Sequence, residues 1–358
     1  MKLGITGTAK SGKTTIFNAI TKLNADISLY DIKQEPNIGV VQVLDERITH
    51  LTELYSPKKT IYATIEYLDF PGIIEDNENH EFLSATSMGL IKTTDALAIV
   101  IRNFEDAYLD ETFGKPNPIK EINNIIEDFI LSDLVIAEKR LEKIHLSYKR
   151  GIKTAQLQIE ETAINKAIEA LNQEKALKEI EFTEDELKSI RGFQFLSLKP
   201  IMIILNSDET NFKNNQTVID QISLIAPVIE FAGKFEMELS KLDDEEAQIF
   251  MEDMNINESA VNRLNEAAYN LLGYISFFTV GSDEVRAWTI QKGDNAVIAA
   301  GKIHSDLARG FIRAETFSYQ DIIQHSNEKT IREKGLFRLE GKNYIVQDGD
   351  ILNIRFNV

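Results

Sequence analysis

The chain has 358 residues, a formal net charge of −18 at neutral pH and no cysteine. This length allows two or three domains with full-sized cores, and the lack of cysteine excludes a disulfide framework and a thiolate zinc site. No run of about 18 apolar residues occurs, so we expect no membrane span. The chain enters its first strand directly after Met1, which predicts a cytoplasmic protein without a signal peptide. The acidic excess argues against a protein that coats nucleic acid, and no DNA partner is expected.

The first predicted element is a phosphate-binding loop. Residues 3–6 predict a short strand and residues 14–23 a helix, and the stretch Gly7-Thr-Ala-Lys-Ser-Gly-Lys-Thr14 between them fits G-x-x-x-x-G-K-[ST]. Glycines let backbone N–H groups curl around a polyphosphate, and the helix N-terminus adds its positive dipole end. Lys13 would reach the β- and γ-phosphates and Thr14 would hold Mg²⁺. The alternative is a glycine-rich turn that binds nothing. The predicted nucleotide-binding residues here are Gly7, Ala9, Lys10, Ser11, Gly12, Lys13, Thr14 and Thr15.

A second nucleotide signature follows the next strand. Residues 24–37 are predicted to be a polar loop, residues 40–43 a strand and residues 45–55 a helix. Residues 61–69 alternate apolar and polar side chains and end in Asp69-Phe-Pro-Gly72. In a D-x-x-G turn at this place, Asp69 would hold the metal ion and the Gly72 N–H would meet the γ-phosphate. Ile73 follows, where many GTPases place a glutamine that orients water, and an apolar side chain cannot do this.

The middle of the chain predicts a helical insertion. Residues 95–102 predict a buried parallel strand, because residues 96–101 are all apolar, and residues 118–195 then show only helical patterns. Apolar residues step by four and three from Ile130 to Tyr148, Gly151 interrupts the run, and residues 154–177 predict a returning helix. Residues 138–153, near the tip of this antiparallel coiled-coil hairpin, carry six Lys or Arg against two Glu. This basic segment is either a solvated helix face or a contact for RNA phosphates.

The base-reading signature is altered. Residues 199–205 predict another buried strand, followed by Asn206-Ser-Asp-Glu209. GTPases read guanine with N-K-x-D, so Ser207 replaces the lysine and Glu209 replaces the aspartate. Residues 228–232 predict the last strand of this domain, and an acidic segment and a helix over residues 258–272 follow.

The C-terminal segment changes to short strands and turns. Residues 277–280 and 285–290 predict a hairpin, and residues 295–303 a helix with Asp294 as its N-cap. The further predicted strands are residues 311–317, 336–339, 344–346 and 351–358. A sheet crossed by one helix indicates a small β-grasp-like domain, and residues 276–358 carry as many basic as acidic side chains. The predicted architecture is an α/β P-loop domain (1–117 and 196–275), a coiled-coil insertion (118–195) and a C-terminal domain (276–358).

In this order, the motifs resemble the YchF / Obg-like ATPase family, a branch of the Ras-like P-loop proteins. The resemblance implies a C-terminal TGS domain of β-grasp fold, a preference for ATP over GTP, association with ribosomes or translation, and slow hydrolysis. It also implies that Asn206 and Glu209 read the base. Besides the phosphate loop and Asp69-x-x-Gly72, the matching strings are Glu35-Pro-Asn-Ile-Gly-Val, Phe104-Glu-Asp, Asn206-x-x-Glu209, Leu242-Asp-Asp-Glu, Ala267-Ala-Tyr-Asn-Leu-Leu-Gly, Thr279-Val-Gly-Ser-Asp-Glu-Val-Arg-Ala-Trp-Thr, Arg309-Gly-Phe-Ile-Arg-Ala-Glu and Val346-Gln-Asp-Gly-Asp.

Three positions depart from the family pattern. Lys33 stands where the family has a switch threonine, and the glycine-rich loop after Asp69-x-x-Gly72 is cut to residues 74–80. The family's catalytic histidine falls by length at Glu111, and His80 in the shortened loop is a weaker candidate for its role. A neutral imidazole can orient water, whereas a carboxylate beside the γ-phosphate repels it.

The leading hypothesis is therefore a slow ATPase that binds ATP, or possibly GTP, together with Mg²⁺. It would act as a switch on a ribosomal or RNA partner through the hairpin tip and the TGS domain. The alternative is a nucleotide-gated binding module with little or no hydrolysis, because the switch threonine, the glycine-rich loop and the histidine are all replaced. A small-molecule P-loop kinase ranks last, since it has no use for a TGS domain.

Overall fold

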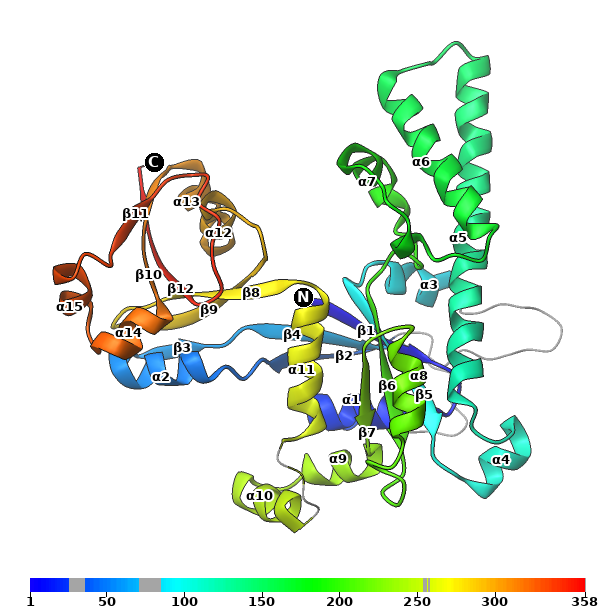
Figure 1. Ribbon diagram of the computed structural model, residues 1–358, viewed down its shortest axis with the longest axis horizontal. Helices are drawn as coiled ribbons and strands as arrows, with labels where there is room; N and C mark the ends of the chain where they lie inside the picture. The colour runs from blue at the N-terminus through cyan, green and yellow to red at the C-terminus, as the bar shows by residue number, and fades with distance from the viewer. Residues whose placement is uncertain (26–35, 71–84, 254–255, 257, 358) are drawn as a thin grey trace. The chain divides into compact units, whose positions relative to one another are not determined.

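The structure is a computed structural model that describes residues 1–25, 36–70, 85–253, 256 and 258–357 (Figure 1). The chain divides into two compact units. The first comprises residues 1–39 and 66–261, and the second comprises residues 40–65 and 262–358. In the described part of the chain, no helix is long and apolar enough to cross a membrane.

The first unit is built on a six-stranded sheet with the strand order β2-β4-β1-β5-β6-β7. Strands β4, β1, β5, β6 and β7 run parallel to one another, so their carboxyl ends meet at one edge. Every residue of β6 is buried, which explains its unbroken apolar run. The strands are β1 (Lys2–Gly7), β2 (Asn37–Gln42), β4 (Thr64–Asp69), β5 (Ala96–Asn103), β6 (Ile201–Ser207) and β7 (Val228–Phe231).

Helices cover this sheet and complete its core. One large apolar cluster joins side chains of β5 and β6, such as Ile99 and Ile203, to Ile122 and Phe129 of α5. This packing fixes the strand ends on which the phosphate loop and the base-reading loop lie. The described helices of the unit outside the insertion are α1 (Lys13–Thr21), α3 (Ala85–Lys92), α4 (Ala107–Phe113), α8 (Gln216–Ser223), α9 (Gly233–Leu239), α10 (Asp244–Asp253) and, in part, α11 (Ala260–Leu271).

The predicted helical hairpin is present, formed by α5 (Pro118–Lys149) and α6 (Ala155–Leu171). Its seam buries Ile130, Ala137 and Ile144 on α5, and Ala163 and Ile164 belong to the same apolar seam on α6. The returning helix ends at residue 171 instead of the predicted 177, because the chain turns back on itself and residue 174 takes a left-handed conformation (φ 57°). Short helices η1 (Leu177–Glu179), α7 (Glu184–Ile190) and η2 (Arg191–Phe193) follow.

The second unit holds a mixed sheet with the order β11-β10-β12-β8-β9-β3. The predicted hairpin is confirmed, since β8 (Tyr274–Thr279) and β9 (Glu284–Gln291) pair antiparallel. The other strands are β3 (Lys59–Ile61), β10 (Phe311–Ser318), β11 (Arg338–Glu340) and β12 (Asp350–Phe356), and the helices after β9 are α12 (Ala296–Ile303), α13 (Ser305–Arg309), α14 (Tyr319–His325) and α15 (Glu328–Glu333).

Three predictions for this unit were wrong in detail. The N-cap of α12 is Asn295, whose Oδ1 accepts from the N–H groups of Val297 and Ile298 at 3.1 Å each. Asp294 instead accepts from the Gln291 N–H at 3.0 Å and closes the turn after β9. Residues 344–346 form no strand and make only an isolated bridge to Asn295, and four helices stand where one was expected.

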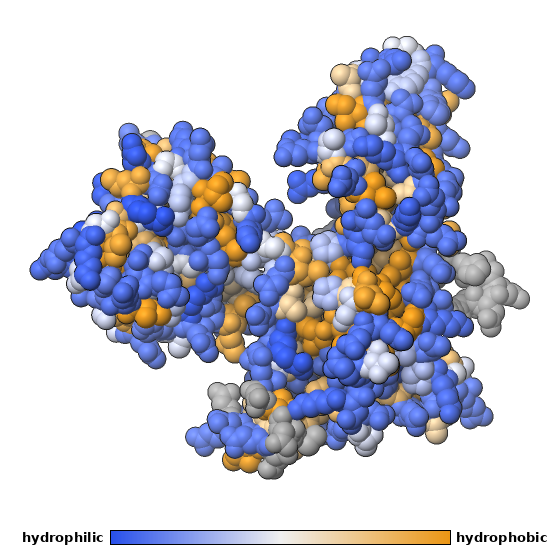
Figure 2. Space-filling view, in the orientation of Figure 1, coloured by the Kyte–Doolittle hydropathy of each residue, from blue (hydrophilic) through white to orange (hydrophobic). Residues whose placement is uncertain are grey.

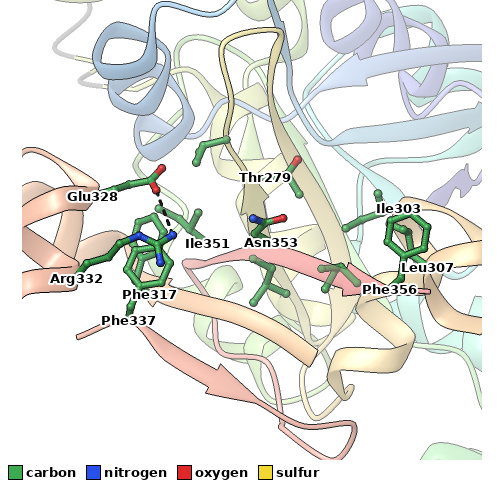
Figure 3. A pocket seen from close by; sticks show the side chains of 13 residues that line it. Thr279, Ile303, Leu307, Phe317, Glu328, Arg332, Phe337, Ile351, Asn353 and Phe356 are labelled. Carbon is green, nitrogen blue, oxygen red and sulfur yellow. Dashed lines mark ion pairs between the residues drawn. The ribbon is translucent and has the colours of Figure 1, made fainter. Parts of the chain in front are cut away.

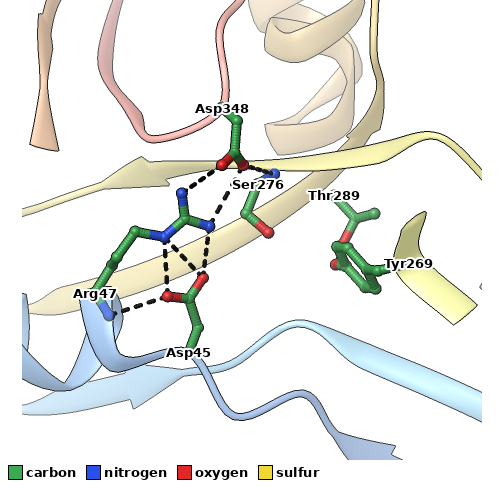
Figure 4. A network of polar contacts seen from close by, with 6 residues as sticks. All are labelled: Asp45, Arg47, Tyr269, Ser276, Thr289 and Asp348. Carbon is green, nitrogen blue, oxygen red and sulfur yellow. Dashed lines mark hydrogen bonds and ion pairs between the residues drawn. The ribbon is translucent and has the colours of Figure 1, made fainter. Parts of the chain in front are cut away.

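Residues 40–65 belong to the second unit, which differs from the predicted domain boundary. Helix α2 (Glu46–Tyr55) buries Ile48 and Leu51 in the same cluster as Phe278, and β3 pairs in parallel with β9. Arg47 adds a polar tie (Figure 4), since its guanidinium donates to Asp45 at 2.8 Å and to Asp348 at 2.7 Å. Burial of an apolar helix face and completion of a sheet edge hold this segment there.

Candidate nucleotide-binding site

The phosphate loop joins β1 to α1 and is shaped by two glycines. Gly7 and Gly12 have φ values of 144° and 93°. A Cβ atom on Gly7 would lie 2.2 Å from the Val100 carbonyl oxygen, and one on Gly12 would lie 2.2 Å from Asn206 Nδ2. Both positions therefore require glycine, and the loop is packed tightly against the ends of β5 and β6.

Lys13 is the buried cation of this loop, with only 6 % of its surface exposed. Its Nζ donates to the carbonyl oxygens of Gly7 at 3.2 Å and Thr8 at 2.6 Å. Burial lowers the pKa of Lys13 to about 8, and the negative charge of Asp69 partly opposes this shift. A buried ammonium group whose hydrogen bonds go to two neutral carbonyls gains strongly from an added anion, so the loop is suited to a polyphosphate.

The predicted metal ligands lie together at the ends of α1 and β4. The Thr14 hydroxyl donates to Asp69 Oδ2 at 3.0 Å, and Asn37 Nδ2 donates to the same oxygen at 3.0 Å. Asp69 is 4 % exposed. A hydroxyl and a carboxylate are hard oxygen ligands of the kind that Mg²⁺ prefers, so these residues fit a magnesium ion beside a bound phosphate. Asn37 was not among the predicted site residues, although it lies in the matching string 35–40.

Asn206 ties the end of β6 to the phosphate loop. Its Nδ2 donates to the Ser11 carbonyl at 2.9 Å, and its Oδ1 accepts from the Gly233 N–H at 3.1 Å. Glu209, the other predicted base-reading residue, is exposed in the turn after β6. The two residues thus lie at the same edge of the sheet but in different settings, and their contact with a base remains a prediction.

The remaining predicted residues are placed as follows. Ala9, Lys10 and Thr15 are partly exposed, and the buried Ser11 hydroxyl has no hydrogen-bond partner within the described residues. Glu111 is exposed on α4, next to Asp110, whose carboxylate pairs with the buried Arg102 at 3.3 Å. Gly72, His80 and Lys33 lie outside the described residues.

A cavity of about 290 Å³ in the second unit offers a weaker candidate (Figure 3). Its walls are mostly apolar, with Phe317 and Ile351 among them. Its two charged residues face each other, since Arg332 lies 3.9 Å from Glu328, and the Arg332 guanidinium also stacks 3.6 Å over the Phe337 ring. These charges satisfy each other, and among the described residues no group of three or more His, Cys, Asp or Glu could hold a metal ion. The phosphate loop is therefore the site that carries chemistry.

Fold and site together define a P-loop nucleotide-binding protein of the Ras-like class. The family described as "50S ribosome-binding GTPase" matches residues 2–140, and YchF-GTPase_C, described as "Protein of unknown function (DUF933)", matches residues 274–357.

Relatives match over nearly the whole chain. The ribosome-binding ATPase YchF of Bacillus subtilis is 39 % identical over 99 % of this chain and 99 % of its own length, and that of Escherichia coli O157:H7 is 37 % identical over 100 % and 99 %. The solved structure of the Schizosaccharomyces pombe YchF GTPase is similar with a TM-score of 0.85, at 29 % identity over 99 % of this chain and 97 % of that one. The chain belongs to the YchF family.

Proposed function

We propose that this protein binds ATP with Mg²⁺, hydrolyses it slowly and acts as a nucleotide-dependent switch on the ribosome in the cytoplasm. The observation that carries the proposal is the buried Lys13 ammonium beside the Thr14–Asp69 pair. The two bacterial relatives named above are ribosome-binding ATPases. In the proposed complex, Lys13 and the N-terminus of α1 hold the phosphates, and Thr14 and Asp69 hold the magnesium ion, which neutralises phosphate charge.

The choice of ATP over GTP is tested by competition of the two nucleotides for the nucleotide-free protein. Glu209 is a carboxylate, so it accepts hydrogen bonds and does not donate them at neutral pH. Guanine offers two N–H donors on its pairing edge and adenine offers one amino group, so the carboxylate alone does not decide the base. A GTP affinity tenfold above that for ATP, about 1.4 kcal/mol, would show that the ATP assignment is wrong.

A second candidate function is a nucleotide-gated binding module with little or no turnover. It is favoured by Glu111, which occupies the position of the family's histidine by length and is an exposed carboxylate. Single-turnover hydrolysis of labelled ATP separates the two, with Lys13→Ala as the background control. A rate equal to buffer would leave only the binding module, and a Glu111→His variant that gains activity would identify the lost group.

The ribosome contact is proposed to use the hairpin tip and the C-terminal domain. Lys149, Arg150 and Lys153 are exposed where α5 turns into α6, and the surface at this end of the hairpin is mainly hydrophilic (Figure 2). Contacts of these side chains with RNA phosphates would weaken as salt displaces them. Ribosome pelleting at two salt concentrations tests this, using glutamine at the three tip positions and Lys188→Gln, an exposed lysine of α7, as the control. Binding that is unchanged by salt or by the tip substitutions would exclude phosphate contacts there.

A further inference from the structure

We propose that Glu230 is a positioning residue for base selection. Its carboxylate fixes both ends of the loop 208–215, which carries Glu209, and so sets where the base-reading side chain lies. This inference rests on the proposed nucleotide binding and deepens it.

The carboxylate of Glu230 receives hydrogen bonds from both ends of that loop. Glu230 lies on β7 and is 8 % exposed. Its Oε1 accepts from Ser207 Oγ at 2.7 Å, at the start of the loop, and from Asn215 Nδ2 at 2.6 Å, at its end. Its Oε2 accepts from the Lys213 N–H at 3.1 Å. Lys213 has a left-handed φ of 68°, and this bond helps to hold that uncommon backbone conformation.

Ser207 connects this anchor to the neighbouring strand. Its hydroxyl accepts from Asn103 Nδ2, at the end of β5, at 3.0 Å and from Asn215 Nδ2 at 3.2 Å while it donates to Glu230. The lysine of N-K-x-D could not take this place, because an ammonium group only donates. Ser207, the serine that replaces the lysine of the guanine signature, is therefore the residue that links the start of the loop to Glu230.

The loop is also ordered from within. Asp208 accepts from the Thr210 hydroxyl at 2.6 Å and from the Asn211 N–H at 2.9 Å, which makes the residues around Glu209 a closed turn. A turn that is closed inside and fixed at both ends can place an exposed carboxylate reproducibly at the mouth of the site. Burial of a carboxylate is costly without hydrogen bonds, so its position on β7 requires the bonds that hold the loop.

The test is the Glu230→Gln variant of the full-length protein. Glutamine keeps the shape but replaces one acceptor oxygen with an NH₂ group, which must then face a donor. We expect the preference between ATP and GTP to shrink by roughly five- to tenfold. Binding of Mg²⁺–tripolyphosphate, which has no base, should change less than about twofold because the phosphate loop is untouched.

Asp133→Asn is the matched control. Asp133 is also a buried carboxylate, and it accepts from the Ser197 hydroxyl at 2.7 Å and from the Leu196 N–H at 2.9 Å, just after the helical insertion. The same chemical change there should lower stability and leave the ATP to GTP preference unaltered. Ser207→Ala keeps the Glu230 carboxylate and removes one of its donors, so a smaller change in the same direction is expected if Glu230→Gln does not fold.

The outcomes separate this inference from the proposed function. A wild-type protein that binds ATP, GTP and tripolyphosphate equally refutes base selection altogether. A wild-type protein that discriminates, with Glu230→Gln and Ser207→Ala discriminating equally well, refutes the positioning role alone. Equal losses for ATP, GTP and tripolyphosphate in these variants, or a loss of preference in Asp133→Asn, would also overturn it.

Discussion

The lowered pKa of Lys13 predicts that nucleotide affinity depends on pH in the alkaline range. In the free protein, burial holds this pKa at about 8. A bound polyphosphate favours the charged ammonium, so the pKa in the complex lies above that of the free protein. The sign follows from this difference. Affinity is at its full value below pH 8, and it falls as the pH rises through 8 towards the pKa of the complex.

The expected size of the change in affinity follows from the titration of Lys13. At pH 9, one unit above the free-state pKa, about nine tenths of Lys13 is uncharged, so affinity should be about tenfold lower than at pH 7, or about 1.4 kcal/mol. Isothermal titration of Mg²⁺–ATP at pH 7, 8 and 9, in two buffers of different ionisation heat, measures both affinity and protons taken up. Uptake should rise from about 0.1 to about 0.9 proton between pH 7 and pH 9.

Two variants check the cause. Lys13→Arg keeps a charge that does not titrate in this range, so its affinity should be lower but flat with pH. The positive charge of Lys10 adds to the lowering of the Lys13 pKa, so Lys10→Gln should move the midpoint to higher pH. A wild-type affinity that stays constant from pH 7 to pH 9 without proton uptake would refute the reasoning.

Three further changes test the geometry. Asp69→Asn should raise the Mg²⁺ concentration needed for ATP binding more than about tenfold, because a ligand charge is lost, and an unchanged magnesium titration would remove Asp69 from the metal site. Gly12→Ala places a Cβ 2.2 Å from Asn206 Nδ2, so ATP binding should be lost. Urea unfolding should show a free energy of unfolding that is lower by about 1–3 kcal/mol. A variant with normal ATP affinity would contradict this packing. Arg47→Met removes the guanidinium that lies 2.7 Å from Asp348, so it should lower the free energy of unfolding of the second unit by about 1–3 kcal/mol. Unfolding of this unit can be measured by the fluorescence of the chain's one tryptophan, and an unchanged midpoint would show that the ion pairs contribute nothing.

The elements with strong local signals were predictable. The predicted strands over residues 95–102 and 199–205 contain the unbroken apolar runs 96–101 and 201–205, which form β5 and β6, adjacent in the first sheet. Such runs are typical of strands buried on both faces, so pattern and burial agree. The phosphate loop could be found as well, because its tight turn demands glycine at fixed spacing.

The place of residues 40–65 could not be predicted. Helical periodicity shows which face of α2 is apolar, but it does not show which part of the chain covers that face. The partner turned out to be a sheet whose strands come from the far end of the sequence, where Thr60 pairs with Val285. Pairing between segments so distant in sequence leaves no local pattern in either of them.

The contacts of Asn206 also join segments that are distant in sequence, so they could not be predicted. They decide how base recognition must be tested. The motif predicts an amide that reads the base, whereas in the structure both polar ends of this amide bond to the backbone, at Ser11 and Gly233. Asn206→Ala should therefore weaken ATP, GTP and tripolyphosphate together, because the phosphate loop loses its tie to β6, and such a loss would say nothing about the base. Glu209 is exposed, so a substitution there tests base recognition separately from phosphate binding. Glu209→Ala should reduce the preference between ATP and GTP and leave tripolyphosphate binding unchanged; if the preference survives, the base is read by other groups.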